Sequence, residues 1–396
     1  MLARYLARSA PAGLRIGLAG RSMAALQEVR AGLGNGAVAW PLLEADTNDS
    51  ESLTALARST RVVVTTAGPY RVHNGIGVVA ACCEERTDYA DLSGEVLFMR
   101  DSADRFHDAA TAAGVRIVHA CGFDSVPSDL AALLLHEQAR ADGAGALDRT
   151  TCVVASLRGG LSGGTFASMR GLFDDLKREP ALGRVVGDPY ALSPDRANEP
   201  QLGYESDLNG VAHEKDLDMW VGPFIMARAN TRVVRRSNAL QEWAYGRNFR
   251  YREVTGFGRG PTAPAKASAM SLGLGGFALG YQSGPGRALF DRLLPKPGEG
   301  PSEKTQRTGK FRFEVHTTTS SGARYVATAA ARGDPGYSAT AVMLGESALS
   351  LAADREQLPG GGGVLTPATA LGTVLVERLR AAGHTYSVAV GSGPRR

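Results

Sequence analysis

The turn Gly20-Arg21-Ser22 carries the most specific chemistry in the first part of the chain. In folds that bind a dinucleotide, the second strand ends beside the adenosine ribose. An acidic residue there suits the free 2′-hydroxyl of NAD, whereas an arginine suits the 2′-phosphate of NADP. Arg21 with Ser22 therefore predicts NADP, with Asp46 either near the adenine or acting only as a capping residue. The alternative interpretation is a solvated arginine after a strand, with Ser22 as the N-cap of the next helix.

A second candidate site follows the segment Arg61–Thr65, which contains three consecutive valines. This pattern is typical of a short strand buried on both faces of a parallel sheet. In open parallel sheets, ligands lie beyond the carboxyl ends of the strands. We therefore expect cofactor contacts at Thr66, Gly68 and Pro69, next to Tyr70. A buried strand followed by an ordinary turn explains the same residues equally well.

A third candidate is the segment from Cys121 to Asp129, which follows another apolar strand and leads into a helix. We expect this junction to close over the nicotinamide end of the cofactor, with Gly122 and Phe123 among the contacts, and to lead into a second domain. Asp124 or Ser125 could also act simply as the helix cap.

The competing chemistry is that of a serine hydrolase. Gly160-Leu161-Ser162-Gly163-Gly164 fits the pattern G-x-S-x-G between an expected strand and an expected helix, which is typical of the nucleophile elbow. Such a short pattern arises readily in a glycine-rich chain, and His316 and His384 are distant in sequence. A turn with Ser162 as a helix cap is the structural explanation.

Alternating strands and helices must position these residues. We expect a doubly wound parallel sheet of the Rossmann type, because short apolar segments alternate with helical stretches up to residue 120. The expected strands are Leu14–Ala19, Val38–Leu43, Arg61–Thr65, Asp88–Leu92 and Arg116–Ala120.

The order of elements at the start departs from that fold. The helical pattern Leu2–Ala10 precedes the strand Leu14–Ala19, so the first strand of the fold and its glycine-rich phosphate loop would have to lie before Met1. We therefore expect both to be absent from this chain. Gly32, Gly34 and Gly36 do not replace that loop, because they follow a helix.

Composition narrows the range of functions. A chain of 396 residues with 43% hydrophobic residues suggests two domains, and a net charge of +4 without a basic stripe argues against nucleic acid as a partner. The four cysteines have no metal-ligand spacing, so no metal site is expected, and reduced thiols favour the cytoplasm. No apolar run near Met1 resembles a secretory signal.

Three later segments are notable. Gly187 to Gly222 is expected to form long loops on a surface that faces the substrate. Thr231 to Tyr251 is rich in arginine and is expected to form a solvated helix face or to line a site for an acidic substrate or carrier. Residues 267–281 are the least polar run and too short to span a membrane, so they could lie on a membrane surface, line an acyl tunnel or be a core helix.

Six motifs together resemble the saccharopine dehydrogenase-like oxidoreductases, most closely the branch of trans-acting enoyl reductases, over nearly the whole chain. They are Thr65-Thr66-Ala67-Gly68-Pro69-Tyr70, Asp91-Leu92-Ser93-Gly94-Glu95, His119 to Asp129, Ser162-Gly163-Gly164-Thr165, Pro335-Gly336-Tyr337-Ser338-Ala339-Thr340 and Gly362-Gly363-Val364-Leu365-Thr366-Pro367. The resemblance implies a dinucleotide-binding domain (1–130), a second α+β domain (131–358) and a C-terminal segment (359–396) that packs back on the first domain.

The resemblance also implies a function. It predicts NADP-dependent reduction of an enoyl double bond in an acyl thioester, in lipid or glycolipid biosynthesis and alongside a polyketide synthase. Tyr70 is the expected proton donor, with Asp124 and Ser125 ordering the site. The expected location is the cytoplasm, with peripheral contact at the plasma membrane through 267–281. A non-catalytic lipid-associated scaffold with a degenerate Rossmann fold is the second hypothesis.

Overall fold

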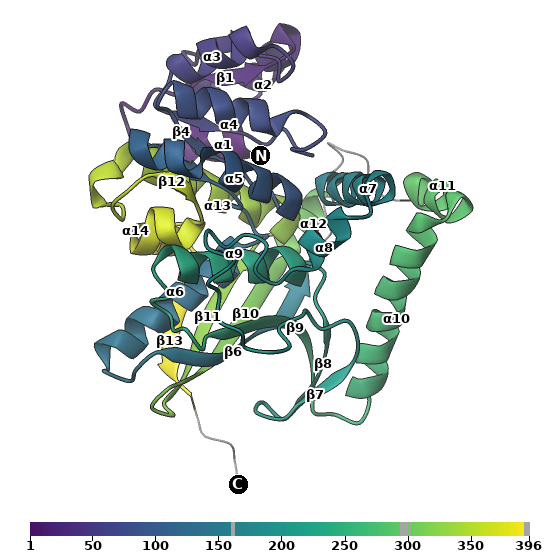
Figure 1. Ribbon diagram of the computed structural model, residues 1–396. Coiled ribbons are helices and arrows are strands. Elements are labelled where there is room, and N and C mark those ends of the chain that lie inside the picture. Colours follow the sequence, from purple (N-terminus) through teal and green to yellow (C-terminus); the bar gives the residue numbers. More distant parts are fainter. Residues whose placement is uncertain (160–162, 294–299, 301, 392–396) are drawn as a thin grey trace.

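The computed structural model describes residues 1–159, 163–293, 300 and 302–391. These residues form two layered units, one above the other in Figure 1. The upper unit contains short parallel strands between helices, and the lower unit is built on one large twisted sheet. The chain is therefore a mixed α/β protein in which the first strands and the longest strands belong to different sheets.

The upper unit contains two parallel sheets. The first pairs β1 (Leu18–Gly20) with β2 (Leu42–Glu44). The second has the order β12-β5-β4-β3. Its strands are β3 (Val62–Val64), β4 (Asp88–Ala90), β5 (Arg116–Val118) and β12 (Gly363–Leu365). Within the described ranges, no strand pairs with β1 opposite β2 or with β3 opposite β4.

Helices cover both faces of the second sheet. Val63 of β3 belongs to a core shared with α3, α4 and α5, whereas Val62 and Val64 pack against the core that contains α13. This confirms the prediction of a strand buried on both sides. The helices of the upper unit are α1 (Leu2–Ser9), α2 (Met23–Ala31), η1 (Asn35–Ala37), α3 (Ser50–Arg58), α4 (Gly75–Glu84), α5 (Val96–Ala113), α13 (Thr340–Ala353) and η3 (Arg355–Gln357).

The lower unit is a seven-stranded sheet of order β13-β11-β10-β6-β9-β8-β7, in which only β6 and β9 pair in parallel. Along β10, Phe311, Phe313 and Val315 face the core and alternate with more exposed polar residues, which is the period-two pattern of a sheet with one covered face. The strands are β6 (Leu147–Arg158), β7 (Ala212–Glu214), β8 (Met219–Pro223), β9 (Arg250–Gly258), β10 (Lys310–Thr319), β11 (Arg324–Arg332) and β13 (Thr385–Val390).

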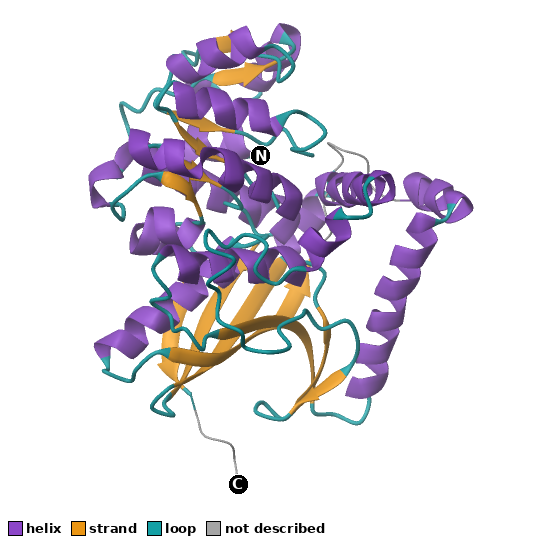
Figure 2. Cartoon of the chain, in the orientation of Figure 1, coloured by secondary structure: helices purple, strands orange, loops and turns teal. Residues whose placement is uncertain are grey.

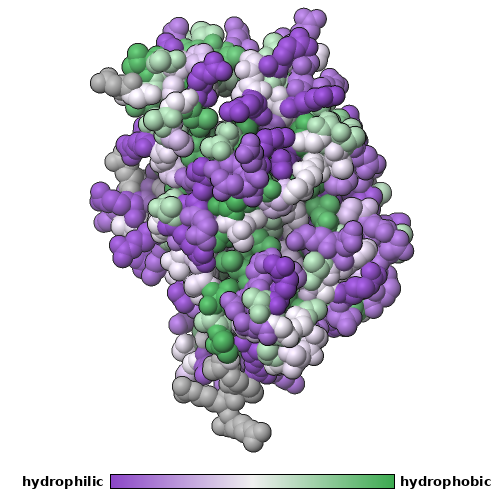
Figure 3. All heavy atoms as spheres, turned by 90° about the vertical axis from the view of Figure 1, so that its left-hand side faces the viewer, coloured by the Kyte–Doolittle hydropathy of each residue, from purple (hydrophilic) through white to green (hydrophobic). Residues whose placement is uncertain are grey.

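Three helices lie between the upper unit and the covered face of this sheet, as Figure 2 shows. They are α6 (Val126–Ala141), α9 (Ala227–Leu240) and α14 (Pro367–Ala381). The remaining helices lie to the side: α7 (Gly163–Arg178), α8 (Leu182–Gly187), α10 (Ala263–Gln282), α11 (Gly284–Leu293), α12 (Glu303–Thr308) and the π-helical turn η2 (Pro335–Ala339). The side of the molecule opposite α10 and α11 is mainly polar, with an apolar strip down its centre (Figure 3).

The structure corrects two expectations from the sequence. The segment 187–222 is not wholly irregular, because it contains β7 and most of β8. The expected solvated face of arginines is buried instead: Arg232, Arg235 and Arg236 lie inside α9 and donate mainly to backbone carbonyls and to two carboxylates. The sequence gives no sign of this, because a buried arginine is tolerated only where acceptors from distant segments surround it.

Candidate active site

The carboxyl ends of β1, β2 and β3 lie along one edge of the upper unit. The Ala45 N–H after β2 donates to the Gly20 carbonyl at the end of β1 (3.1 Å). Asn74, in the loop after β3, donates through Nδ2 to the Thr47 carbonyl (2.6 Å). The segments that begin at Arg21 and Thr65 therefore share an edge, although their strands belong to separate sheets.

The residues predicted for the adenosine end lie at this edge. Arg21 is exposed and has no hydrogen-bond or ion-pair partner among the described residues, so its guanidinium is available to an anion. Ser22 caps α2 by accepting from the Ala25 N–H (3.3 Å). Asp46 accepts from the Asn48 N–H (2.9 Å) and so shapes the turn after β2. Ser22 and Asp46 thus have structural roles whether or not a nucleotide binds.

The loop after β3 is held tightly. Thr66 is exposed, and Gly68 and Pro69 are joined by a cis peptide bond. Tyr70 is buried, and its hydroxyl donates to the Thr65 carbonyl (3.1 Å) and accepts from the Leu92 N–H (3.3 Å). The phenol therefore connects the ends of β3 and β4. Burial and the nearby Asp91 raise the pKa of Tyr70 well above its ordinary value.

Glu95 fixes the backbone of this loop. Its two carboxylate oxygens accept from the consecutive N–H groups of Tyr70 (2.8 Å) and Arg71 (3.1 Å). Oε1 also accepts from the Ser168 hydroxyl of α7 (2.8 Å), and Arg71 pairs with Asp175 of the same helix (2.8 Å). Two polar contacts thus connect α7 to the loop at the end of β3.

A buried network joins the ends of β4 and β5. Asp91 Oδ2 accepts from the Tyr89 hydroxyl (2.9 Å) and lies 2.7 Å from His119 Nδ1. His119 Nε2 lies 2.8 Å from Ser102 Oγ. Asp91 Oδ1 accepts from the Ala120 N–H (3.1 Å), where the backbone has an unusual φ of 60°. Each of these polar groups has a partner, so the network fixes the two strand ends.

Asp124 is the carboxyl group at the junction of the two units. A Cβ added to Gly94 would lie 3.7 Å from Asp124 Oδ2 and 3.5 Å from Met226 Cε, so these two side chains border Gly94 from the two units. Burial, reinforced by the negative charge of Asp91, raises the pKa of Asp124 to about 7. A half-buried carboxyl group with this pKa can hold a proton near neutral pH.

Ser125 begins a chain of hydrogen bonds that runs into the lower unit. Its hydroxyl donates to Asn230 Oδ1 (3.2 Å), and Asn230 Nδ2 donates to Glu253 Oε2 (2.8 Å). Glu253 Oε1 accepts from the Tyr251 hydroxyl (2.9 Å). Burial raises the pKa of Glu253 to about 7. Glu253 therefore sets the orientation of the Asn230 amide, and the amide sets the direction of the Ser125 hydroxyl.

Gly122 and Phe123 are not at the exposed edge. A Cβ on Gly122 would lie 3.1 Å from Leu92 Cβ and 3.3 Å from Thr340 Cγ2. The Phe123 N–H donates to Thr340 Oγ1 (3.0 Å), and its ring packs edge-to-face on Phe311. Both residues are buried where β5 leads into α6. Their packing therefore fixes the backbone directly before Asp124 and Ser125.

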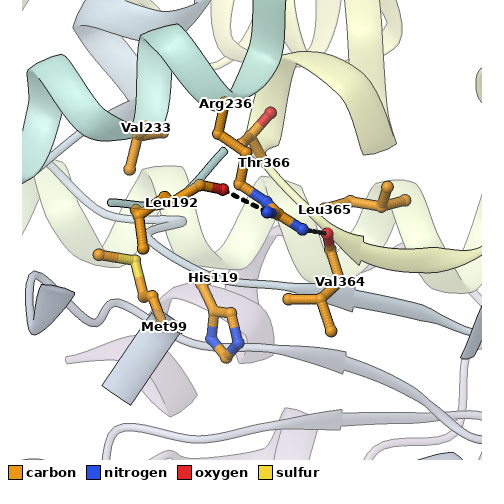
Figure 4. A pocket seen from close by; sticks show the side chains of 8 residues that line it. All are labelled: Met99, His119, Leu192, Val233, Arg236, Val364, Leu365 and Thr366. Atoms are coloured by element: carbon orange, nitrogen blue, oxygen red, sulfur yellow. Dashed lines mark hydrogen bonds between the residues drawn. The ribbon is translucent and has the colours of Figure 1, made fainter. Parts of the chain in front are cut away.

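Two hollows flank these residues. A cleft of ≈ 490 Å³ lies between the loop after β3, α5 and α7, and Tyr70, Phe98 and Asp175 are among its lining residues. A much smaller cavity of ≈ 10 Å³ separates His119 from Arg236 (Figure 4). Arg236 closes that cavity by donating to the Leu192 and Val364 carbonyls. Only the first hollow is large enough for part of a substrate.

Sequence reasoning assigned no roles to Asp91, Glu95, His119, Asn230 or Glu253. The first three occur in the motifs quoted for the family resemblance, and these motifs could have pointed to them as residues of the site. Asn230 and Glu253 carry no local pattern. The rival nucleophile Ser162 lies outside the described residues. Among those residues, no cluster of His, Cys, Asp and Glu could hold a metal ion, and no helix is both long and apolar enough to cross a membrane.

Comparisons with known proteins agree with this architecture. No family model matches the chain. The chain is 50% identical over 391 residues to "Putative trans-acting enoyl reductase Rv2449c" of Mycobacterium tuberculosis, covering 97% of this chain and 93% of the relative. It is 45% identical over 392 residues to "Trans-acting enoyl reductase" of Mycobacterium bovis, with the same coverage of 97% and 93%.

Among solved structures, the fold is similar to that of saccharopine dehydrogenase (L-Glu forming) from Saccharomyces cerevisiae. The TM-score is 0.56 at 12% sequence identity, over 99% of this chain and 98% of the other. At that identity the likeness concerns the fold alone, and it confirms the Rossmann-type architecture. The chain belongs to the trans-acting enoyl reductase family and has a saccharopine dehydrogenase-like fold.

Proposed function

We propose that this protein is an NADP-dependent enoyl reductase that saturates the double bond of an acyl thioester in lipid or glycolipid biosynthesis. The names of its relatives support the reaction class. The observation that carries the proposal is the edge shared by Arg21 and the Thr66–Tyr70 loop, which the Asn74–Thr47 hydrogen bond holds together. A bound dinucleotide has to reach from one of these segments to the other.

The residues at this edge fit NADP at its adenosine end. Arg21 is exposed and without a partner among the described residues, and a guanidinium group suits a phosphate through two parallel hydrogen bonds. Thr66, Gly68 and Pro69 would border the opposite end of the cofactor. When bound, the nicotinamide supplies the hydride for the β-carbon of the thioester.

The chain must then supply a proton to the α-carbon. Tyr70, the donor expected from the sequence, has its hydroxyl engaged by Thr65 and Leu92, and its pKa is raised well above the ordinary value. Asp124 is half-buried at the junction of the units, and its pKa is about 7. We therefore favour Asp124 as the proton donor, with Tyr70 holding the strand ends and Ser125 orienting the site.

The cleft beside Tyr70 suits a thioester carried by another protein. It has an apolar side formed by Tyr70, Ile76 and Phe98, and charged residues at Arg71 and Asp175. A reductase that acts in trans needs such an opening, because its substrate arrives attached to a carrier. We propose a polyketide synthase as that partner.

The test is NADPH oxidation with a short enoyl thioester such as crotonyl-coenzyme A, combined with titration of NADPH and NADH by fluorescence. Arg21→Ala should weaken NADPH binding at least tenfold and leave NADH binding unchanged. Asp124→Asn should lower turnover on the order of a hundredfold with little change in the NADPH Kd. Equal weakening for both nucleotides would contradict the role of Arg21, and unchanged turnover would remove Asp124 from the mechanism.

The same experiments address the other hypotheses. Failure of the chain to bind either nucleotide would favour the non-catalytic scaffold. Labelling of Ser162 by a serine-directed phosphonate, together with thioester hydrolysis in the absence of NADPH, would favour the hydrolase.

A further inference from the structure

Helix α10 is rich in apolar residues and is nevertheless largely exposed. In α10 the only charged residue is Lys266, and no further charge follows until Arg287 of α11. Leu272 and Leu279, two turns apart on this helix, are 76% and 73% exposed. The core-helix interpretation of 267–281 is therefore wrong. In Figures 1 and 2, α10 lies along the side of the molecule, with α11 at its upper end.

One face of α10 is packed. Ala263, Ala267 and Tyr281 are buried, and a Cβ on Gly222 of β8 would lie 3.7 Å from the Ala267 carbonyl oxygen. At the upper end, Tyr281 stacks on Phe173 of α7, with ring centroids 5.6 Å apart. The aromatic side chain of Tyr281 thus packs toward the rest of the protein. The exposed side of α10 consists largely of aliphatic side chains and glycines.

Helix α11 also has exposed leucines. Leu289 and Leu293 are 56% and 68% exposed, and Arg292 is exposed between them. Lys266 is exposed near the start of α10, so an exposed cation lies near each end of this pair of helices. We refer to Lys266, Leu272, Leu279, Leu289, Arg292 and Leu293 as the α10–α11 face. A helix that is apolar all round is normally covered on every side, and this one is covered on one side only.

The composition of the α10–α11 face distinguishes between possible occupants. Protein interfaces are enriched in aromatic residues and carry about one hydrogen bond per 100–200 Å². This face presents leucines, alanines and glycines between its flanking cations, and its aromatic rings point inward. Acyl chains need no hydrogen-bonding partners, and anionic headgroups attract flanking lysine and arginine. At 20 residues, α10 is about 30 Å long, so a helix lying flat would contact the bilayer surface over that length.

We propose that the α10–α11 face binds peripherally to an anionic lipid membrane, with the leucines among the acyl chains and Lys266 and Arg292 among the headgroups. This contact with the membrane would also bring the substrate cleft close to the membrane surface. Arg287 of α11 donates to both oxygens of Asp174 in α7 (2.5 and 2.9 Å). The next residue, Asp175, pairs with Arg71 beside the substrate cleft. Two neighbouring aspartates of α7 thus connect α11 to the loop that lines the cleft.

The test is co-sedimentation of the full chain with phosphatidylcholine vesicles that contain 30% phosphatidylglycerol, compared with pure phosphatidylcholine vesicles. Binding should be stronger to the anionic vesicles and should fall as salt is raised. The double variant Leu272→Glu with Leu279→Glu should bind at least tenfold more weakly. Tyr204→Glu, which changes a residue that is 82% exposed on a loop outside the α10–α11 face, should bind like the unaltered protein. Circular dichroism should show the same helix content in all three proteins.

Equal sedimentation of the double variant and the unaltered protein would overturn the proposal, as would absence of binding to anionic vesicles. A dimer that the double variant dissociates, without vesicle binding, would assign the face to a second copy of the chain and would also overturn it. The assay contains no nucleotide and no thioester. Its failure is therefore distinguishable from failure of the proposed reaction.

Discussion

Replacing Glu253 with glutamine tests whether a carboxyl group buried next to Asn230 lowers the stability of the folded protein when it ionises. Glu253 is 1% exposed and accepts from Asn230 and Tyr251. Glutamine has nearly the same shape but cannot ionise, and one of its two acceptor positions becomes a donor. The glutamine carbonyl can still accept from Asn230 Nδ2, but its Nε2 then faces the Tyr251 hydroxyl, which has to turn and loses the hydrogen bond that it donates.

The expected effect on stability depends on pH. Burial raises the pKa of Glu253 from 4.5 to about 7 in the folded protein. Between these values the folded state binds more protons than the unfolded state, so stability falls as pH rises. Above pH 7 the full cost of keeping the carboxylate buried is about 3 kcal/mol, at 1.36 kcal/mol per pH unit. Glutamine carries no such cost, whereas the lost hydrogen bond costs about 1–2 kcal/mol at every pH.

Urea unfolding of both proteins at pH 5 and pH 8 measures this difference. Relative to the unaltered protein, Glu253→Gln should gain about 2 kcal/mol in stability between pH 5 and pH 8. Asp124 and Asp129, whose pKa values burial also raises to about 7, are present in both proteins and cancel. Glu179→Gln, at an exposed position, should show no such gain. Parallel pH profiles for all three proteins would refute the reasoning.

Two further substitutions test the packing around the site and the first helix. Tyr70→Phe leaves the Leu92 N–H without its partner and should cost about 1–3 kcal/mol of stability in urea unfolding; if Tyr70 is the proton donor, turnover should also fall on the order of a hundredfold at unchanged NADPH affinity. Gly345→Ala would place its Cβ 2.4 Å from Tyr5 Cδ1, so we expect a loss of about 1–3 kcal/mol from overpacking, measured as a lower Tm. Gly360→Ala meets open space and should leave Tm unchanged, and an equal change in both glycine variants would contradict the packing argument.

Local patterns were sufficient to predict much of the upper unit. The strands expected over Asp88–Leu92 and Arg116–Ala120 contain β4 and β5, and the three valines after Arg61 form β3 with both faces covered. These elements depend on short-range signals: apolar spacing, caps and helix stops. The strand expected over Leu14–Ala19 is shorter, because only Leu18–Gly20 pair with β2. Strand ends depend on the partner strand, which local sequence does not reveal.

The site was less predictable, because its polar groups become partners only in three dimensions. Arg21 and Thr66 could be placed at strand ends from the sequence alone. The contact between Ser125 and Asn230 joins residues 105 positions apart, and no spacing rule links them. Tyr70 was expected to donate a proton to the substrate, but whether a tyrosine at a strand end donates to a substrate or to the backbone depends on the neighbouring loop.

The C-terminal part of the chain explains why the junction between the units can be rigid. β12 adds to the upper sheet beside β5, and β13 adds to the lower sheet beside β11, with α14 between them. The carboxylate of Asp129 in α6 accepts from the Ala368 N–H at the start of α14 and from the Ser237 hydroxyl of α9. A carboxyl group bound in this way resists rotation of α14 against α6 and α9, because the movement would leave a buried polar group without its hydrogen-bond partners. This arrangement holds the start of α6, directly after Asp124 and Ser125, in place between the two units.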